Sequence, residues 1–268
     1  MLKDITLGQY FPGRSVIHRL DPRIKLITMI VYIVALFLAD GVVSYALATG
    51  FVAAAIAISG IKPKLILKSL KAIIFIVLFT AVLNMLYTPG DVLVSFWIIR
   101  ITKQGIFTSF GMGLRVILLV TISALLTYTT SPMALTDGLE NLLSPLKKLH
   151  IPVHEFAMMM TIALRFIPTL IEETDKIMSA QKARGADFES GNIIKRAKAL
   201  IPVLIPLFVS SFRRADELAT AMECRLYHGG NGRTRLNSLR YGKIDAVGGV
   251  VIVLVCAAII VVSKVFGL

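Results

Sequence analysis

Two arginines stand where long helical stretches are expected to end, Arg184 in "AQKARGADF" and Arg225 in "AMECRLYHGG". The arginine guanidinium presents five N–H donors in a rigid fork, which binds a carboxylate through two parallel hydrogen bonds. Ala183 and Gly185 are small, so a partner surface can approach the first guanidinium closely. The two arginines are therefore candidates for cationic tips that bind acidic grooves of a partner.

Both arginines also have a purely structural interpretation. Gly185 is a natural left-handed residue at the end of a helix, and the Gly229-Gly230 break follows Arg225. A cation in the last turn of a helix interacts favourably with the negative end of the helix dipole. Helix capping and partner docking are therefore both possible roles. We favour docking, because two such arginines occur in one chain and each of them ends a long helix.

Other candidate chemistry is sparse. The chain has no G-x-x-x-x-G-K-[ST] phosphate-binding motif, so energy from ATP has to come from a partner. His150 and His154 are four residues apart, but Pro152 lies between them and the zinc-protease motif is incomplete. A membrane-embedded enzyme would need a polar constellation at headgroup level, and none has adequate spacing. We therefore expect a protein that is not an enzyme and that holds no cofactor and no metal.

The elements that position these residues belong to a membrane protein. The 268 residues are 56% hydrophobic, and the mean hydropathy is +0.78, well above the values typical of soluble domains. A hydrocarbon core of about 30 Å requires roughly 20 helical residues. Five stretches predict spans: 24–39, 42–59, 71–88, 105–130 and 246–264. The first has an uninterrupted apolar core resembling a signal peptide, but Asp21 and Pro22 before it are typical of a helix start.

Lysine and arginine near the spans predict the orientation. Residues 1–25 carry five basic residues and the turn after the second span carries Lys62, Lys64, Lys68 and Lys71, whereas the alternate connections are poor in them. By the positive-inside rule the N-terminus is cytoplasmic in the cell membrane and the C-terminus is outside. Three regions follow: a membrane domain with four helices (1–130), a cytoplasmic coupling domain (131–245) and a C-terminal transmembrane helix (246–268).

The predicted coupling domain is dominated by two long helices, over about 154–184 and 193–227. Each is amphipathic and too long for a small globular domain, so we expect a helix pair along the inner face of the membrane. Pro202 and Pro206 should kink the second helix and let it act as a hinge. The stretch supplies less than half of the formal net charge of +13. Because basic charge beside membrane spans contacts anionic lipid, we expect no nucleic-acid partner.

Several further residues have two interpretations. Met158, Met159, Met160, Met178 and Met222 suit a surface that repacks against different partners, or ordinary core and lipid contacts. Arg115 is the only charged residue well inside a span, where it can pair with a carbonyl or a lipid headgroup. Cys224 and Cys256 are too few for a disulfide scaffold, and we expect both to serve packing.

Five motifs together resemble the transmembrane coupling (T) component of energy-coupling factor (ECF) transporters, which are ABC-type importers of vitamins and some metal ions. They are "YFPGRSVIHRLDPRIKL" (10–26), "ALRFIPTL" (163–170), "AQKARGADF" (180–188), "ADELATAMECRLY" (215–227) and "GGNGRTR" (229–235). The resemblance implies an all-α membrane protein whose coupling domain is built of long crossed helices. It also implies two ABC ATPase subunits and a substrate-binding membrane protein (S component) as partners.

The resemblance assigns ATPase docking to two triplets, Ala183, Arg184 and Gly185 in the first, and Cys224, Arg225 and Leu226 in the second. The second triplet departs from the pattern, because Cys224 stands where alanine is usual and Leu226 where a small residue is common. Two alternatives remain: a dedicated cobalt, nickel or biotin version of the same subunit, and a stand-alone permease. A permease would need its own solute site in the membrane.

Overall fold

The computed structural model describes residues 10–89, 91–96, 99–188, 190, 192–229, 239 and 241–266. The chain forms two compact units. The bundle unit consists of Gly8–Leu142 with Leu239–Leu268, and the two-helix unit consists of Leu143–Ser238 with Met1–Leu7. The prediction of an all-α membrane protein is confirmed, and a short β-hairpin is added between two of the helices.

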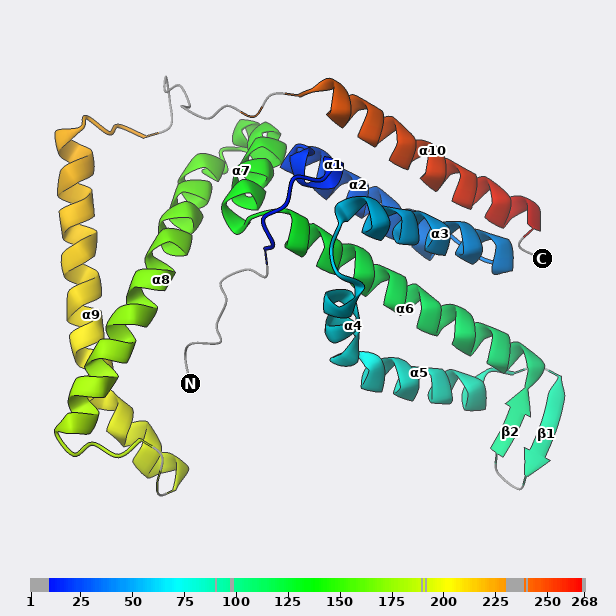
Figure 1. Cartoon of the computed structure of the whole chain (residues 1–268), viewed down its shortest axis with the longest axis horizontal. Helices are drawn as coiled ribbons and strands as arrows, with labels where there is room; N and C mark the ends of the chain where they lie inside the picture. Colours follow the sequence, from blue (N-terminus) through cyan, green and yellow to red (C-terminus); the bar gives the residue numbers. More distant parts are fainter. Residues whose placement is uncertain are drawn as a thin grey trace. The chain divides into compact units, whose positions relative to one another are not determined.

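The elements of both units are drawn in Figure 1. The bundle unit contains α1 (Val16–Arg19), α2 (Pro22–Phe37), α3 (Val42–Ser59), α4 (Pro63–Lys71), α5 (Ile74–Tyr87), the antiparallel strands β1 (Val92–Phe96) and β2 (Ile99–Thr102), α6 (Lys103–Thr129), α7 (Pro132–Leu143) and α10 (Lys243–Phe266). The two-helix unit contains the 3-10 helix η1 (Ser144–Leu149), α8 (Val153–Ala183) and α9 (Ile193–Cys224).

The core of the bundle unit lies where α2, α3, α6 and α10 pack together. Tyr32 and Leu36 of α2 are completely buried there, and Ile259 of α10 packs with them. The Tyr32 hydroxyl donates to the carbonyl of Ala48 on α3 at 3.2 Å, so a polar atom in the core is satisfied. Small residues such as Ala48 let helices approach closely, as is typical of membrane bundles.

A polar cluster joins the start of α2 to α10. The Asp21 main-chain N–H donates to Asp245 Oδ1 at 2.7 Å, although the two residues lie 224 positions apart. Asp21 caps α2 by accepting from the Arg23 N–H at 2.8 Å, as Asp21 and Pro22 in the sequence predict. Burial acts to raise the pKa of Asp21, but hydrogen bonds and charge from Arg23 outweigh it and hold that pKa below its usual value. The N-terminal and C-terminal parts of the bundle are thus joined by a hydrogen bond from the Asp21 main chain to the buried Asp245 carboxylate.

The described spans differ from the prediction in two helices. Helices α3, α6, α8 and α10 are long and apolar enough to cross a membrane, and α4 with α5 forms a candidate span bent by 59°. The predicted first span, 24–39, corresponds to α2, which begins and ends two residues earlier and ends at Phe37 before Asp40 and Gly41. Its 16 residues extend about 24 Å, less than a hydrocarbon core of about 30 Å, so α2 is not among the candidate spans. Helix α8 is apolar enough to qualify as a span, whereas the sequence interpretation placed it in the cytoplasm. Which side each unit faces stays a prediction.

Candidate functional site

The two-helix unit is an antiparallel pair. The Glu173 carboxylate of α8 forms an ion pair with Arg214 of α9, and Gln181 near the end of α8 donates to the carbonyl of Pro202 at 3.5 Å. The contact that lies later in α8 lies earlier in α9, so the two helices run in opposite directions. The C-terminal ends of α8 and α9 accordingly lie at opposite ends of the helix pair (Figure 1).

The end of α8 is a Schellman cap built around Arg184. The Gly185 N–H donates to the carbonyl of Lys182, and the Ala186 N–H donates to the carbonyl of Gln181, both at 3.0 Å. Gly185 has φ of 89°, the left-handed conformation that this cap requires and that glycine adopts without a steric penalty. The sequence expectation for this helix end agrees with the structure.

The end of α9 repeats the same hydrogen-bond pattern around Arg225. The Leu226 N–H donates to the carbonyl of Glu223 at 2.9 Å, and the Tyr227 N–H donates to the carbonyl of Met222 at 3.0 Å. The left-handed residue is Leu226, with φ of 56°. Helix α9 therefore ends at Cys224, directly before Arg225, rather than near 227. Gly230 of the predicted glycine break lies outside the described residues. A non-glycine residue in the left-handed conformation costs about 1–2 kcal/mol.

Both candidate tips are accessible. Ala183, Arg184 and Gly185 are exposed, and so are Cys224, Arg225 and Leu226. Within the part of the chain that the structure describes, neither guanidinium forms a hydrogen bond or an ion pair. Both forks are therefore open to an external carboxylate. The packing role expected for Cys224 is wrong, because its thiol is exposed, whereas Cys256 is buried in the core.

The two prolines of α9 are four residues apart, inside a helix that continues through both. Proline has no N–H, so Pro206 cannot donate to the carbonyl four residues earlier, which belongs to Pro202. This carbonyl instead accepts from Gln181 of α8. The first part of α9 runs in a different direction from the rest (Figure 1). A bent segment is thus linked to the helix turn that carries Arg184.

The two-helix unit also exposes apolar side chains. On α8, Phe156, Met159 and Met160 are each more than half exposed. On α9, Ile205, Phe208 and Phe212 are exposed to about 60% or more. Met158, Met178 and Met222 are only partly exposed. Met159 and Met160 therefore fit an apolar contact surface, because a flexible thioether adapts to different partners.

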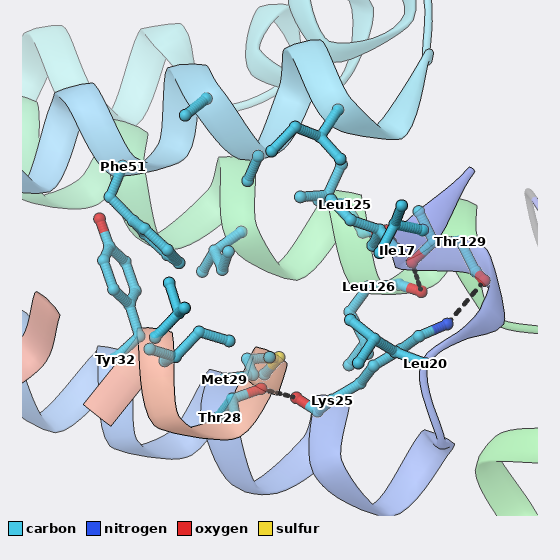
Figure 2. Close-up of a pocket in the computed structure, with 18 of the residues that line it drawn as sticks. Ile17, Leu20, Lys25, Thr28, Met29, Tyr32, Phe51, Leu125, Leu126 and Thr129 are labelled. Atoms are coloured by element: carbon cyan, nitrogen blue, oxygen red, sulfur yellow. Dashed lines mark hydrogen bonds between the residues drawn. The ribbon is translucent and has the colours of Figure 1, made fainter. Parts of the chain in front are cut away.

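An apolar cavity of about 630 Å³ lies in the bundle unit, lined by α1, α2, α3, α6 and α10. Figure 2 shows Lys25 among its lining residues, with the ammonium turned toward Thr129. The Lys25 Nζ donates to the carbonyl of Thr129 at 3.1 Å and to Thr130 Oγ1 at 3.0 Å. The Thr28 hydroxyl likewise donates to the carbonyl of Ile24. These polar groups are directed to the protein itself, so the cavity suits an apolar guest better than a polar solute.

Arg115 on α6 pairs with a carbonyl, one of its two expected partners. It donates to the carbonyl of Ala39 at 2.9 Å and lies 3.6 Å from the Asp40 carboxylate. The guanidinium is thus held at the turn between α2 and α3. Through this bond Arg115 satisfies the carbonyl of Ala39, which follows the end of α2.

Comparison with known proteins decides the family. Residues 13–236 match the CbiQ family, described as cobalt transport protein. The chain is 55% identical over 251 residues to the energy-coupling factor transporter transmembrane protein EcfT of Acidaminococcus fermentans, covering 94% of each. The EcfT of Ruminiclostridium cellulolyticum is 52% identical over 254 residues, 94% of this chain and 95% of the relative. The EcfT of Bacillus subtilis is 48% identical over 262 residues, 97% and 98%.

The chain belongs to the family of transmembrane (T) components of ECF transporters. The family match includes both helix ends and both prolines of this T component. Sequence reasoning located the two arginines but missed two features of their surroundings. Nothing in the sequence indicates that Leu226 adopts the left-handed conformation, and nothing indicates that Gln181 reaches Pro202, since both depend on the folded backbone.

Proposed function

We propose that this T component transmits ATP-driven movement of two ABC ATPase subunits to an S component in the cell membrane, for uptake of a vitamin or another micronutrient. The observation that carries the proposal is the pair of exposed arginines, each at the same type of helix cap, at opposite ends of one antiparallel helix pair. Each guanidinium would bind carboxylates in a groove of one ATPase subunit. The chain itself is non-catalytic in this scheme.

Helix geometry supports two separate docking positions. Pro202 lies level with Gln181, one turn before Arg184, and Arg225 follows 23 residues later along α9. At 1.5 Å per residue the tips are separated by on the order of 30 Å. That separation allows each arginine its own subunit. The exposed apolar surface with Phe156, Met159 and Met160 would bind the S component.

The proposed orientation places the N-terminus and the two-helix unit in the cytoplasm. Basic residues before α2 and along α4 support it through the positive-inside rule. The stand-alone permease is disfavoured because the polar groups lining the cavity are directed to the protein itself. The matching family is described as cobalt transport, so a dedicated cobalt, nickel or biotin version remains the second candidate. Mass spectrometry of the co-purifying S component would identify the substrate class.

Charge reversal of both arginines tests the proposal. The double variant Arg184→Glu/Arg225→Glu should lose the ATPase subunits on purification from membranes, because each buried charge pair contributes about 2–5 kcal/mol and like charges repel. The matched control Lys176→Glu/Arg213→Glu makes the same charge change on the same helices away from the tips and should retain them. Capping alone predicts a loss of about 0.3–1 kcal/mol in helix stability with the complex intact. Retention of both subunits by the double tip variant, with uptake preserved, would refute docking.

A further inference from the structure

The two docking tips differ at one position of an otherwise shared cap. Both helix ends have the same pair of main-chain hydrogen bonds after the arginine. The residue that takes the left-handed conformation is Gly185 in one and Leu226 in the other. An added Cβ at Gly185 would meet no atom within 4 Å, so the space around that tip is open. The difference between the tips therefore lies in what each presents to a partner.

Leu226 is unfavourable for the isolated chain on two grounds. Its φ of 56° is strained for a residue with a Cβ, and glycine would make the same hydrogen bonds without that strain. Its side chain is 76% exposed, so burial within the chain does not offset the strain. A leucine held in this way beside Arg225 has the properties of a contact residue that waits for a partner.

We propose that Leu226 is a specificity-determining contact that inserts into an apolar niche beside the carboxylates of one ATPase subunit. The other tip, with Ala183 and Gly185 on either side of its arginine, fits a groove that closes against the main chain and has no room for a leucine. The two ATPase grooves are then not interchangeable, and the T component determines which groove occupies which end. This inference rests on the proposed function of the tips.

The side chain and the strain can be separated by two substitutions. Leu226→Gly removes the side chain and relieves the strain, whereas Leu226→Ala removes most of the side chain and keeps a Cβ in the left-handed conformation. Burial of a leucine side chain corresponds to about 10- to 150-fold in Kd. Both variants should therefore bind one ATPase subunit about 10- to 150-fold more weakly and the other as the wild type does. The melting temperature of Leu226→Gly should equal or exceed that of the wild type.

The experiment uses the full chain in nanodiscs and the separately purified ATPase subunits that co-purify with the wild type. Binding of each fluorescently labelled subunit is titrated against the wild type, Leu226→Gly and Leu226→Ala. The variant Gly185→Leu is titrated in parallel, with Gly185→Ala as the control for strain at the first tip. We expect Gly185→Leu to bind the subunit of the first tip more weakly than Gly185→Ala does. Binding of Leu226→Gly at wild-type affinity, or binding of Gly185→Leu as tight as that of Gly185→Ala, would overturn the inference.

An Arg225→Glu variant separates the two levels of the proposal. If Arg225→Glu loses one ATPase subunit while Leu226→Gly binds it normally, docking stands and the role of Leu226 is refuted. If Arg225→Glu also binds normally, docking itself fails. Loss of binding in Arg225→Glu, Leu226→Gly and Leu226→Ala together supports both.

Discussion

Replacing Pro202 and Pro206 together with alanine should straighten α9 and slow uptake more than it weakens assembly. Proline is about 3 kcal/mol less favourable than alanine inside a helix, because it lacks a donor and clashes with the carbonyl four residues earlier. For Pro206 the carbonyl four residues earlier belongs to Pro202, and Gln181 of α8 donates to that carbonyl instead. The double variant restores two main-chain donors, and the one at 206 can replace Gln181 at the carbonyl of residue 202.

The expected size of the effect follows from adding the two positions. Two replacements together favour the straight helix by up to about 6 kcal/mol. Moving a two-state equilibrium from 1:99 to 99:1 takes about 5.5 kcal/mol, so the double variant can convert a bent helix into a straight one. A single replacement, at about 3 kcal/mol, should shift the population only in part. Uptake should fall in that order, from wild type through the single variants to the double variant.

The assay pairs a distance with a rate. Spin labels at the exposed positions Lys198 and Arg213 lie on either side of the bend, and pulsed dipolar spectroscopy measures their separation in the assembled transporter. Uptake is measured in proteoliposomes of the same preparation. Pro168→Ala in α8 is the matched control, since it replaces one interior proline without changing α9. A longer distance with unchanged uptake would reduce the bend to a packing detail, and an unchanged distance would show that the prolines do not cause it.

Two further predictions concern topology and stability. Single cysteines placed at 61–70 and 186–192 should be labelled only from the cytoplasmic side, and one at 89–92 only from outside; labelling of 186–192 from outside would refute the cytoplasmic assignment of the two-helix unit. Asp245→Asn should lower the melting temperature in detergent by several degrees, because an amide cannot accept the two main-chain N–H bonds from Asp21 and Gly242 as a carboxylate does. An unchanged melting temperature would show that the cluster does not stabilise the bundle.

Much of the local structure can be predicted from the sequence because it depends on neighbouring residues. Asp21 and Pro22 determine where α2 begins, through a side-chain cap and a fixed φ. Gly185 determines where α8 ends, because it adopts the left-handed conformation without strain. Apolar length predicts a membrane protein, and the spacing of Arg184 and Arg225 predicts two cationic tips.

Tertiary structure decided the features that depend on contacts between distant segments. Asp21 meets Asp245 only because α2 and α10 pack together. Gln181 reaches the carbonyl of Pro202 only because α8 and α9 run antiparallel. The sequence predicts that the second long helix continues to about 227, yet α9 ends at Cys224 and Leu226 adopts the left-handed backbone conformation in spite of the strain. The sequence by itself thus determined which segments form helices and that an arginine stands near the end of each long helix. The folded backbone decided how each arginine is presented, because strain and long-range hydrogen bonds arise only when the segments are held together.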